Sequence, residues 1–242
     1  MALDHSVEVS VMKVRLKFRK YGVMKFIGHL DIMRYFQKAM RRASIPIAYS
    51  QGFSPHMIMS FANPLGVGLT SDGEYFDIEL IEKINSISAV TQLNSVMVEG
   101  IEIISFVELP DDQKTGMSIV SAADYRVTLK EGKFSDAFIE GLSRFVSESE
   151  ILIMKKTKKS FREVDIRPLI YKLEFNEESV FMQVATGSVE NLKPDLVMEA
   201  LLGYLGIEKE TMKFHYHRLE VYADCTEETR FISLEDLGVN IL

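Results

Sequence analysis

The order in which hydrophobic periodicity changes along the chain is the feature that most limits its fold. Residues 13–19 alternate basic and apolar side chains, as in a half-buried strand, and residues 30–43 place apolar side chains at helical spacing. Strand patterns follow at 47–49 or 57–61 and at 74–80, then a helix pattern at 87–98 and a strand pattern at 100–107. The order strand–helix–strand–strand–helix–strand predicts a ferredoxin-like unit.

A similar order begins again after the turn-rich residues 110–121. The second set of patterns comprises strands at 125–130, 151–155, 169–175, 180–185 and 212–223 and helices at 134–147 and 194–204. This second unit has one strand more than a ferredoxin-like unit. We expect an α+β protein of two tandem ferredoxin-like domains, at residues 12–109 and 122–225, with a C-terminal tail at residues 226–242. A single larger α+β domain is the alternative.

The composition limits the chemistry and the location that we expect. Cys225 is the only cysteine among 242 residues, so the chain has no intrachain disulfide and lacks the thiolates of an iron–sulfur cluster. We expect no metal and no cofactor. No apolar run approaches the roughly 18 residues of a membrane helix, and the first residues do not resemble a signal peptide. We therefore expect a cytoplasmic protein without membrane contact.

Positive charge is concentrated in two parts of a chain whose net charge is −7. Residues 12–62 hold ten Lys and Arg and one acid, Asp31. On the expected helix at 30–43, Arg34, Lys38 and Arg41 lie opposite the apolar face, with Asp31 at the edge of their group. A second group is expected on a loop: Lys155, Lys156, Lys158, Lys159, Arg162 and Arg167. We expect the two groups to form one surface for RNA or another anion. Two solvated charged faces are the alternative.

We expect a different role for the basic residues of the strand at 13–19. In the ferredoxin-like order the strand at 74–80 lies beside it and offers Asp77 and Glu79 on the same face. Neutralisation within the sheet is therefore favoured over nucleic-acid binding for this strand.

The segment YSQGFSPHMIMSF, at residues 49–61, is the best candidate site. Gly52 permits positive φ and Pro55 fixes φ, so the segment reads as a turn that presents polar and aromatic side chains. The candidates on it are Tyr49, Ser50, Gln51, Phe53, Ser54 and His56. His29 and His56 are candidates for acid–base catalysis. No spacing of nucleophile, base and orienting group is present, so structural roles for both are favoured.

Residues 24–79 carry a family resemblance. Its motifs are His29-Leu30-Asp31, Arg41-Arg42-Ala43, the segment from Tyr49 to His56, Pro64-Leu65, Gly66 with Gly68, and Ser71 with Glu74. Together with VDIRPLI at 164–170, they make the chain similar to radical-SAM-linked proteins, a bacterial family found fused to or encoded beside a radical-SAM protein. Gly28 departs from the Ser expected there. The resemblance implies a separate radical-SAM partner and gene neighbours in RNA processing, and it supplies no reaction.

The leading hypothesis is a non-catalytic RNA- or substrate-binding accessory module. It would work with a separate radical-SAM enzyme, in RNA modification or processing. One alternative is a metal-independent endoribonuclease of tandem ferredoxin-like type that uses His29 or His56. Another is a purely protein-binding module that docks a partner through Phe53 and Met57.

Overall fold

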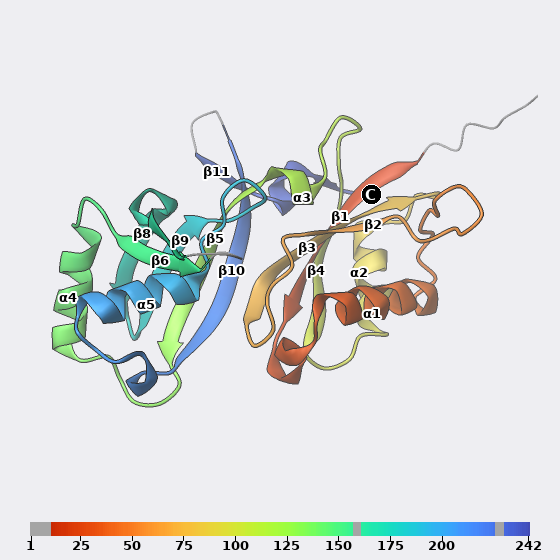
Figure 1. Cartoon of the computed structure of the whole chain (residues 1–242). Coiled ribbons are helices and arrows are strands. Elements are labelled where there is room, and N and C mark those ends of the chain that lie inside the picture. The colour runs from red at the N-terminus through yellow and green to blue at the C-terminus, as the bar shows by residue number, and fades with distance from the viewer. Residues whose placement is uncertain (1–10, 157–160, 226–229) are drawn as a thin grey trace, which may run out of the picture.

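Strands from both ends of the chain meet in one large sheet (Figure 1). The computed structural model describes residues 11–156, 161–225 and 230–242. Within these residues it has five α-helices, a ten-stranded and mostly antiparallel sheet, and a separate two-stranded sheet. The expected α+β class is confirmed. The tandem ferredoxin-like arrangement and its domain boundaries remain predictions.

The first half of the chain builds one end of the large sheet. Its elements are β1 (Met12–Lys20), α1 (His29–Arg42), β2 (Met59–Ala62), β3 (Thr70–Leu80), α2 (Ser86–Asn94) and β4 (Ile101–Glu108). β1 lies between β3 and β4, and β2 pairs with β3. The apolar side chains of β1 alternate with its basic ones, so Val14, Leu16 and Phe18 pack against Phe36 of α1 and Leu93 of α2 in one buried cluster. Both helices therefore cover the same face of the sheet.

The second half continues the sheet from β10. Its elements are α3 (Gly116–Ile119), β5 (Val120–Leu129), α4 (Asp136–Val146), β6 (Leu152–Lys156), β7 (Phe161–Asp165), β8 (Ile170–Asn176), β9 (Ser179–Ala185), α5 (Pro194–Tyr204) and β10 (Phe214–Asp224). The strand order is β10-β5-β9-β8. A second apolar cluster joins α4 and α5 to β5 and β9. In the described part of the chain, short 3₁₀ helices lie at Gly22–Phe26, Arg167–Leu169, Lys209–Thr211 and Glu235–Leu237.

The basic loop expected at residues 155–167 is largely a β-hairpin, so that expectation was wrong in form. β6 and β7 pair with each other outside the large sheet, in a register that sets Ile153 opposite Val164. Both side chains pack against the core of the second half, which gives this basic segment an apolar anchor. Lys158 and Lys159 lie outside the described residues.

The two halves join where β3 and β10 run side by side. The pairing is parallel and short, with His217 opposite Thr70 and Arg218 opposite Ser71. Gly73 of β3 lies directly against β10, because a Cβ there would sit 2.8 Å from the Cα of Glu220. Parallel pairing of such limited length leaves much of the contact between the halves to side chains.

The last residues return to the first half. After β10, β11 (Phe231–Ser233) pairs with β10, and β12 (Val239–Asn240) pairs with β4 at the far edge of the sheet. The Ile241 N–H donates a hydrogen bond to Ser86 Oγ at 2.8 Å, and Ile241 is buried in the first cluster. The segment expected as a tail thus pairs with both halves. No helix among the described ranges is long and apolar enough to span a bilayer.

Candidate functional site

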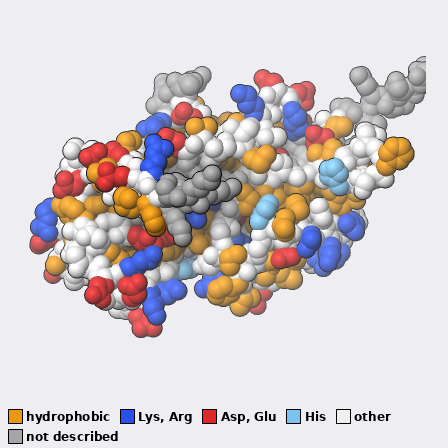
Figure 2. Space-filling view, in the orientation of Figure 1, with side chains coloured by type: hydrophobic (Ala, Val, Ile, Leu, Met, Phe, Trp, Pro, Cys, Tyr) orange, Lys and Arg blue, Asp and Glu red, His pale blue; other side chains and the backbone are white. Residues whose placement is uncertain are grey.

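Helix α1 presents a row of basic side chains to solvent. Ile32, Phe36, Ala39 and Met40 are its buried residues, so Arg34, Lys38 and Arg41 face outward. Arg34 lies 3.5 Å from Asp31, with both side chains about two thirds exposed, so this contact is weak. Lys38 and Arg41 make no ion pair with any described residue. Figure 2 shows Lys and Arg side chains gathered over this helix.

The segment after α1 is a loop closed at its base by Ser50 and His56, and it projects from the first half (Figure 1). The Ser50 N–H donates to the His56 carbonyl at 2.8 Å, and Ser50 Oγ lies 2.8 Å from His56 Nδ1. The His56 N–H also donates to Ser50 Oγ at 3.1 Å. Gly52, at φ 108°, turns the chain within the loop. Ser50 and His56 therefore hold the loop in shape.

The tip of the loop is open to solvent. Gln51 and Ser54 are exposed, Tyr49 is partly exposed, and the Phe53 side chain is fully exposed within the described part of the chain. Met57, in contrast, belongs to the buried cluster under α1. The expectation that Met57 contacts a partner was wrong, because apolar alternation turns it inward, opposite Tyr49. Of Phe53 and Met57, only Phe53 is exposed enough to contact a partner.

The two candidate catalytic histidines lie apart. His29 is the first residue of α1, and its ring packs edge-on against Phe61 with centroids 5.4 Å apart. His56 precedes Phe61 by five residues of extended chain, which separates their backbones by roughly 16 Å at 3.3 Å per residue. The N-cap residue of α1 is Gly28, which has no side chain that could accept a hydrogen bond from the first turn. The geometry therefore gives no acid–base pair on one substrate atom.

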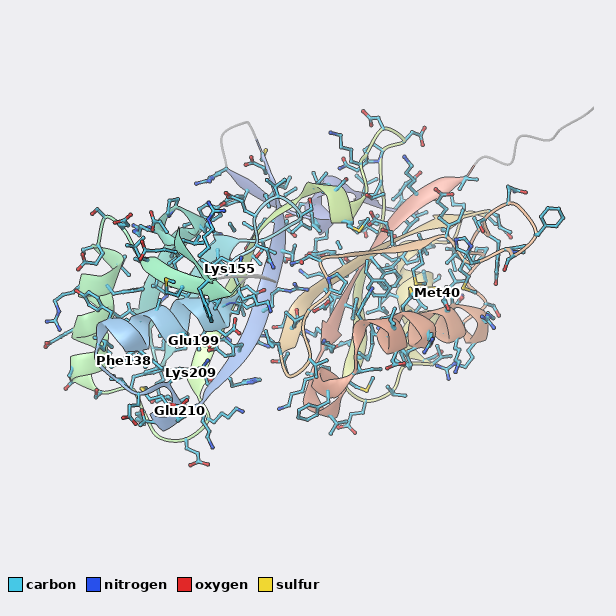
Figure 3. All side chains as sticks on the ribbon, viewed as in Figure 1. Met40, Phe138, Lys155, Glu199, Lys209 and Glu210 are labelled. Atoms are coloured by element: carbon cyan, nitrogen blue, oxygen red, sulfur yellow. The ribbon has the colours of Figure 1, made fainter. Side chains whose placement is uncertain are left out.

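The basic hairpin lies in the other half of the molecule. Lys155 of β6 is directly opposite Arg162 of β7, and both are exposed. Figure 3 shows Lys155 over the second half and Met40 on α1 in the first. Arg167 is engaged locally, since its guanidinium donates to the carbonyls of Glu148 and Ile170. One continuous anion surface across the hairpin and α1 stays a prediction.

The basic face of β1 is neutralised inside the protein. Arg15 makes two contacts with Asp77, at 2.7 and 3.0 Å, as the sequence predicted. Lys17 binds Glu220 and Glu235, which come from β10 and the C-terminal segment. Burial alone would lower the Lys17 pKa, but these two carboxylates raise it above its usual value. This face therefore offers little free charge to a nucleic acid.

A pocket that the sequence did not reveal lies between the two halves. Its volume is about 480 Å³. The loop between β2 and β3 lines it from one half and the first residues of α5 line it from the other, with β5 and β10 between them. In Figure 1 the N-terminal end of α5 faces that loop. Its polar lining residues are Asn63, Tyr125, Asn191, Lys193, Asp195, Tyr216 and Arg218.

Buried charges lie beneath this pocket. Arg218 is fully buried and lies 2.9 Å from Glu74, while its Nη1 donates to the Asn63 carbonyl at 3.0 Å. Burial would lower the Arg218 pKa, but Glu74 raises it, so the guanidinium stays charged. Burial lowers the pKa of Lys20, which also lies near Glu74 and Arg218. Two cations thus share one buried carboxylate.

The opposite face of the β3–β10 junction carries a second polar cluster. His215 and His217 lie on one face of β10, and Thr70 Oγ1 lies 3.2 and 2.8 Å from their ring nitrogens. His217 Nε2 lies 3.0 Å from Asp72. Burial, together with Lys25 and other nearby cations, lowers the pKa of His215. Across the described residues no group of three or more His, Cys, Asp or Glu is arranged to hold a metal.

The pocket was missed because its residues are scattered. Arg218, Tyr216 and Tyr125 lie on strands in which polar and apolar residues alternate, and nothing local marks them as a site. The only signal was the motif Pro64-Leu65-Gly66 with Glu74, which lines or supports the pocket. Its GxG element was too short to indicate phosphate binding by itself.

Comparisons with known proteins add a family and no activity. A family model described as "Uncharacterized protein conserved in bacteria (DUF2344)" matches residues 13–194. No curated protein matches the sequence. A crystal structure of an unknown protein from Galdieria sulphuraria aligns with 86% of this chain and 98% of that chain, at 12% identity and a TM-score of 0.25. That score is too low to carry an argument.

Proposed function

The chain belongs to this uncharacterised bacterial family, and we propose that it is a non-catalytic accessory module that binds single-stranded RNA. One observation carries the proposal. The exposed Lys38 and Arg41 of α1 have no ion pair among the described residues, and the chain after α1 continues into a loop whose tip holds a fully exposed Phe53. Nonspecific RNA binding uses this pairing of positive charge with an aromatic ring on which a base stacks.

The contrast between the two basic elements of the first half supports this assignment. On β1, Arg15 and Lys17 are bound to carboxylates, whereas on α1, Lys38 and Arg41 have no ion pair among the described residues. Charges that need only to stabilise the fold are paired, and charges left free in a chain of net charge −7 are available for an anion.

Reversing the charge of α1 tests the proposal. Arg34→Glu/Lys38→Glu/Arg41→Glu is expected to weaken binding of a single-stranded oligoribonucleotide by about 2–3 kcal/mol, or roughly 30- to 150-fold, since three exposed contacts are lost. Fluorescence anisotropy at fixed salt measures this. The matched control reverses three exposed cations of the second half, Arg126, Lys130 and Arg144. Equal losses in both variants, or none in either, would contradict an RNA site on α1.

The strand order supports the finer description of the fold. In the first half β4, β1 and β3 are neighbours and β2 pairs with β3, while the second half has the order β10-β5-β9-β8. We propose that each half is a ferredoxin-like unit, the first within residues 12–109 and the second within residues 122–225, with the β6–β7 hairpin as an insertion in the second. Small four-stranded αβ units of this kind include RNA-binding domains, and the fold by itself does not decide between binding and catalysis.

The proposed partner is a separate radical-SAM enzyme, which would act on the presented RNA in a cytoplasmic complex. The motifs from His29 to Glu74 motivate this partner, and Cys225 is the only cysteine in the chain. Purification of the tagged chain from its bacterium is expected to enrich one radical-SAM protein, identified by mass spectrometry. Phe53→Ala tests contact through the loop tip and leaves the core untouched. If no radical-SAM protein is enriched, with or without ribonuclease treatment, the partnership is refuted.

A further inference from the structure

The pocket between the halves has the size and construction of a small-molecule site. At about 480 Å³ it lies within the roughly 300–1,000 Å³ of typical ligand pockets. Leu65, Val67 and Leu69 line it from the first half, and Pro194 lines it from the second. Pockets shared between two structural units are common ligand sites, because both units contribute polar groups to one ligand.

The charged residues that line the pocket favour an anionic ligand. Lys193 and Arg218 line the pocket against one acid, Asp195, and beneath it Lys20 and Arg218 share Glu74. Arg218 is fully buried, and its guanidinium lies against the Glu74 carboxylate and the Tyr125 hydroxyl. A buried guanidinium stabilises negative charge strongly, because the surroundings screen it poorly.

The remaining lining groups suit a flat ring that carries amino groups. Tyr125 and Tyr216 stay protonated because burial raises the pKa of both hydroxyls. The ring of Tyr216 is partly exposed and can stack on a base, whereas Tyr125 is buried and forms the floor of the pocket. The Asn63 and Asn191 side chains both donate and accept hydrogen bonds. The Asp195 carboxylate can accept from an exocyclic amino group.

We propose that this pocket binds a nucleoside monophosphate unit. The phosphate lies toward Lys193 and Arg218, and the base lies against Tyr216. The unit is either a free nucleotide or the 5′-phosphorylated end of an RNA. The inference does not require RNA binding along α1, so the two can fail separately.

Titration calorimetry of the full chain with AMP, adenosine and inorganic phosphate tests the pocket. AMP is expected to bind, with adenosine at least about tenfold weaker because the phosphate contact is lost. Lys193→Glu and Tyr216→Ala should each lower the affinity for AMP by about tenfold or more. Lys130→Glu, an exposed control in the same half, should leave AMP binding unchanged, as should the triple reversal on α1.

Three results would overturn the assignment. One is no AMP binding up to about 10 mM. The second is equal affinity for AMP and adenosine, and the third is wild-type affinity in both pocket variants. Competition then separates the sources of the nucleotide. A 5′-phosphorylated oligoribonucleotide that displaces AMP, where its 5′-hydroxyl counterpart does not, identifies an RNA end as the ligand. Failure of both RNAs to displace AMP identifies a free nucleotide.

Discussion

Replacing Arg15 with Met is expected to lower the free energy of unfolding by about 3–5 kcal/mol, because the change leaves a buried carboxylate without its cation. Arg15 is fully buried, and its guanidinium holds Asp77 through two contacts. Its Nη1 also donates to the Leu234 carbonyl at 3.1 Å, so it ties the C-terminal segment to β1. Urea unfolding followed by circular dichroism measures the loss.

Two variants show whether the effect belongs to the buried pair. Arg15→Met/Asp77→Leu removes both charges and is expected to recover part of the lost stability. Lys13→Met, on the same face of β1 but partly exposed, is expected to change stability by less than about 0.5 kcal/mol. If Arg15→Met were as mild as Lys13→Met, the ion pair would not be holding the sheet and the C-terminal segment together.

Gly73→Ala is expected to cost about 2–3 kcal/mol by forcing β3 and β10 apart. The new Cβ would meet the Cα of Glu220 at 2.8 Å and the Leu219 carbonyl oxygen at 3.0 Å. Both are backbone atoms, so no side chain can move aside to relieve the overlap. Because this strand contact joins the halves, thermal unfolding should also broaden or separate into two transitions.

The control for this variant is the same substitution in open space. A Cβ at Gly203, near the end of α5, meets nothing within 4 Å, so Gly203→Ala should stabilise the helix by about 0.5 kcal/mol. Wild-type stability in Gly73→Ala would show that the close approach of β3 and β10 does not constrain how the halves meet.

Hydrophobic periodicity was sufficient to predict the helices and strands that bury one regular face. The pattern at 194–204 matches α5 residue for residue, and that at 30–43 differs from α1 by one residue at each end. Pairing of Arg15 with Asp77 also followed from strand order. These features depend on period and neighbouring strands, both of which are written in short stretches of sequence.

Features that depend on contacts between distant segments could not be predicted. Lys17 is neutralised by Glu220 and Glu235, more than 200 positions away. The strand at 161–165 could not be predicted because it follows a run of lysines that is typical of a loop, and only the packing of Val164 on the second core reveals it. The junction pocket needs both halves in place, so Arg218 and Lys193 carried no signal of their own.

The salt dependence of RNA affinity tests the central claim most directly. If the cations of α1 neutralise three or four phosphates of single-stranded RNA, the logarithm of affinity should fall with the logarithm of salt concentration with a slope of about −2 to −3. The Arg34→Glu/Lys38→Glu/Arg41→Glu variant should show a slope at least about 2 units shallower. A wild-type slope near zero, or a variant that keeps the wild-type slope, would contradict RNA binding on this surface.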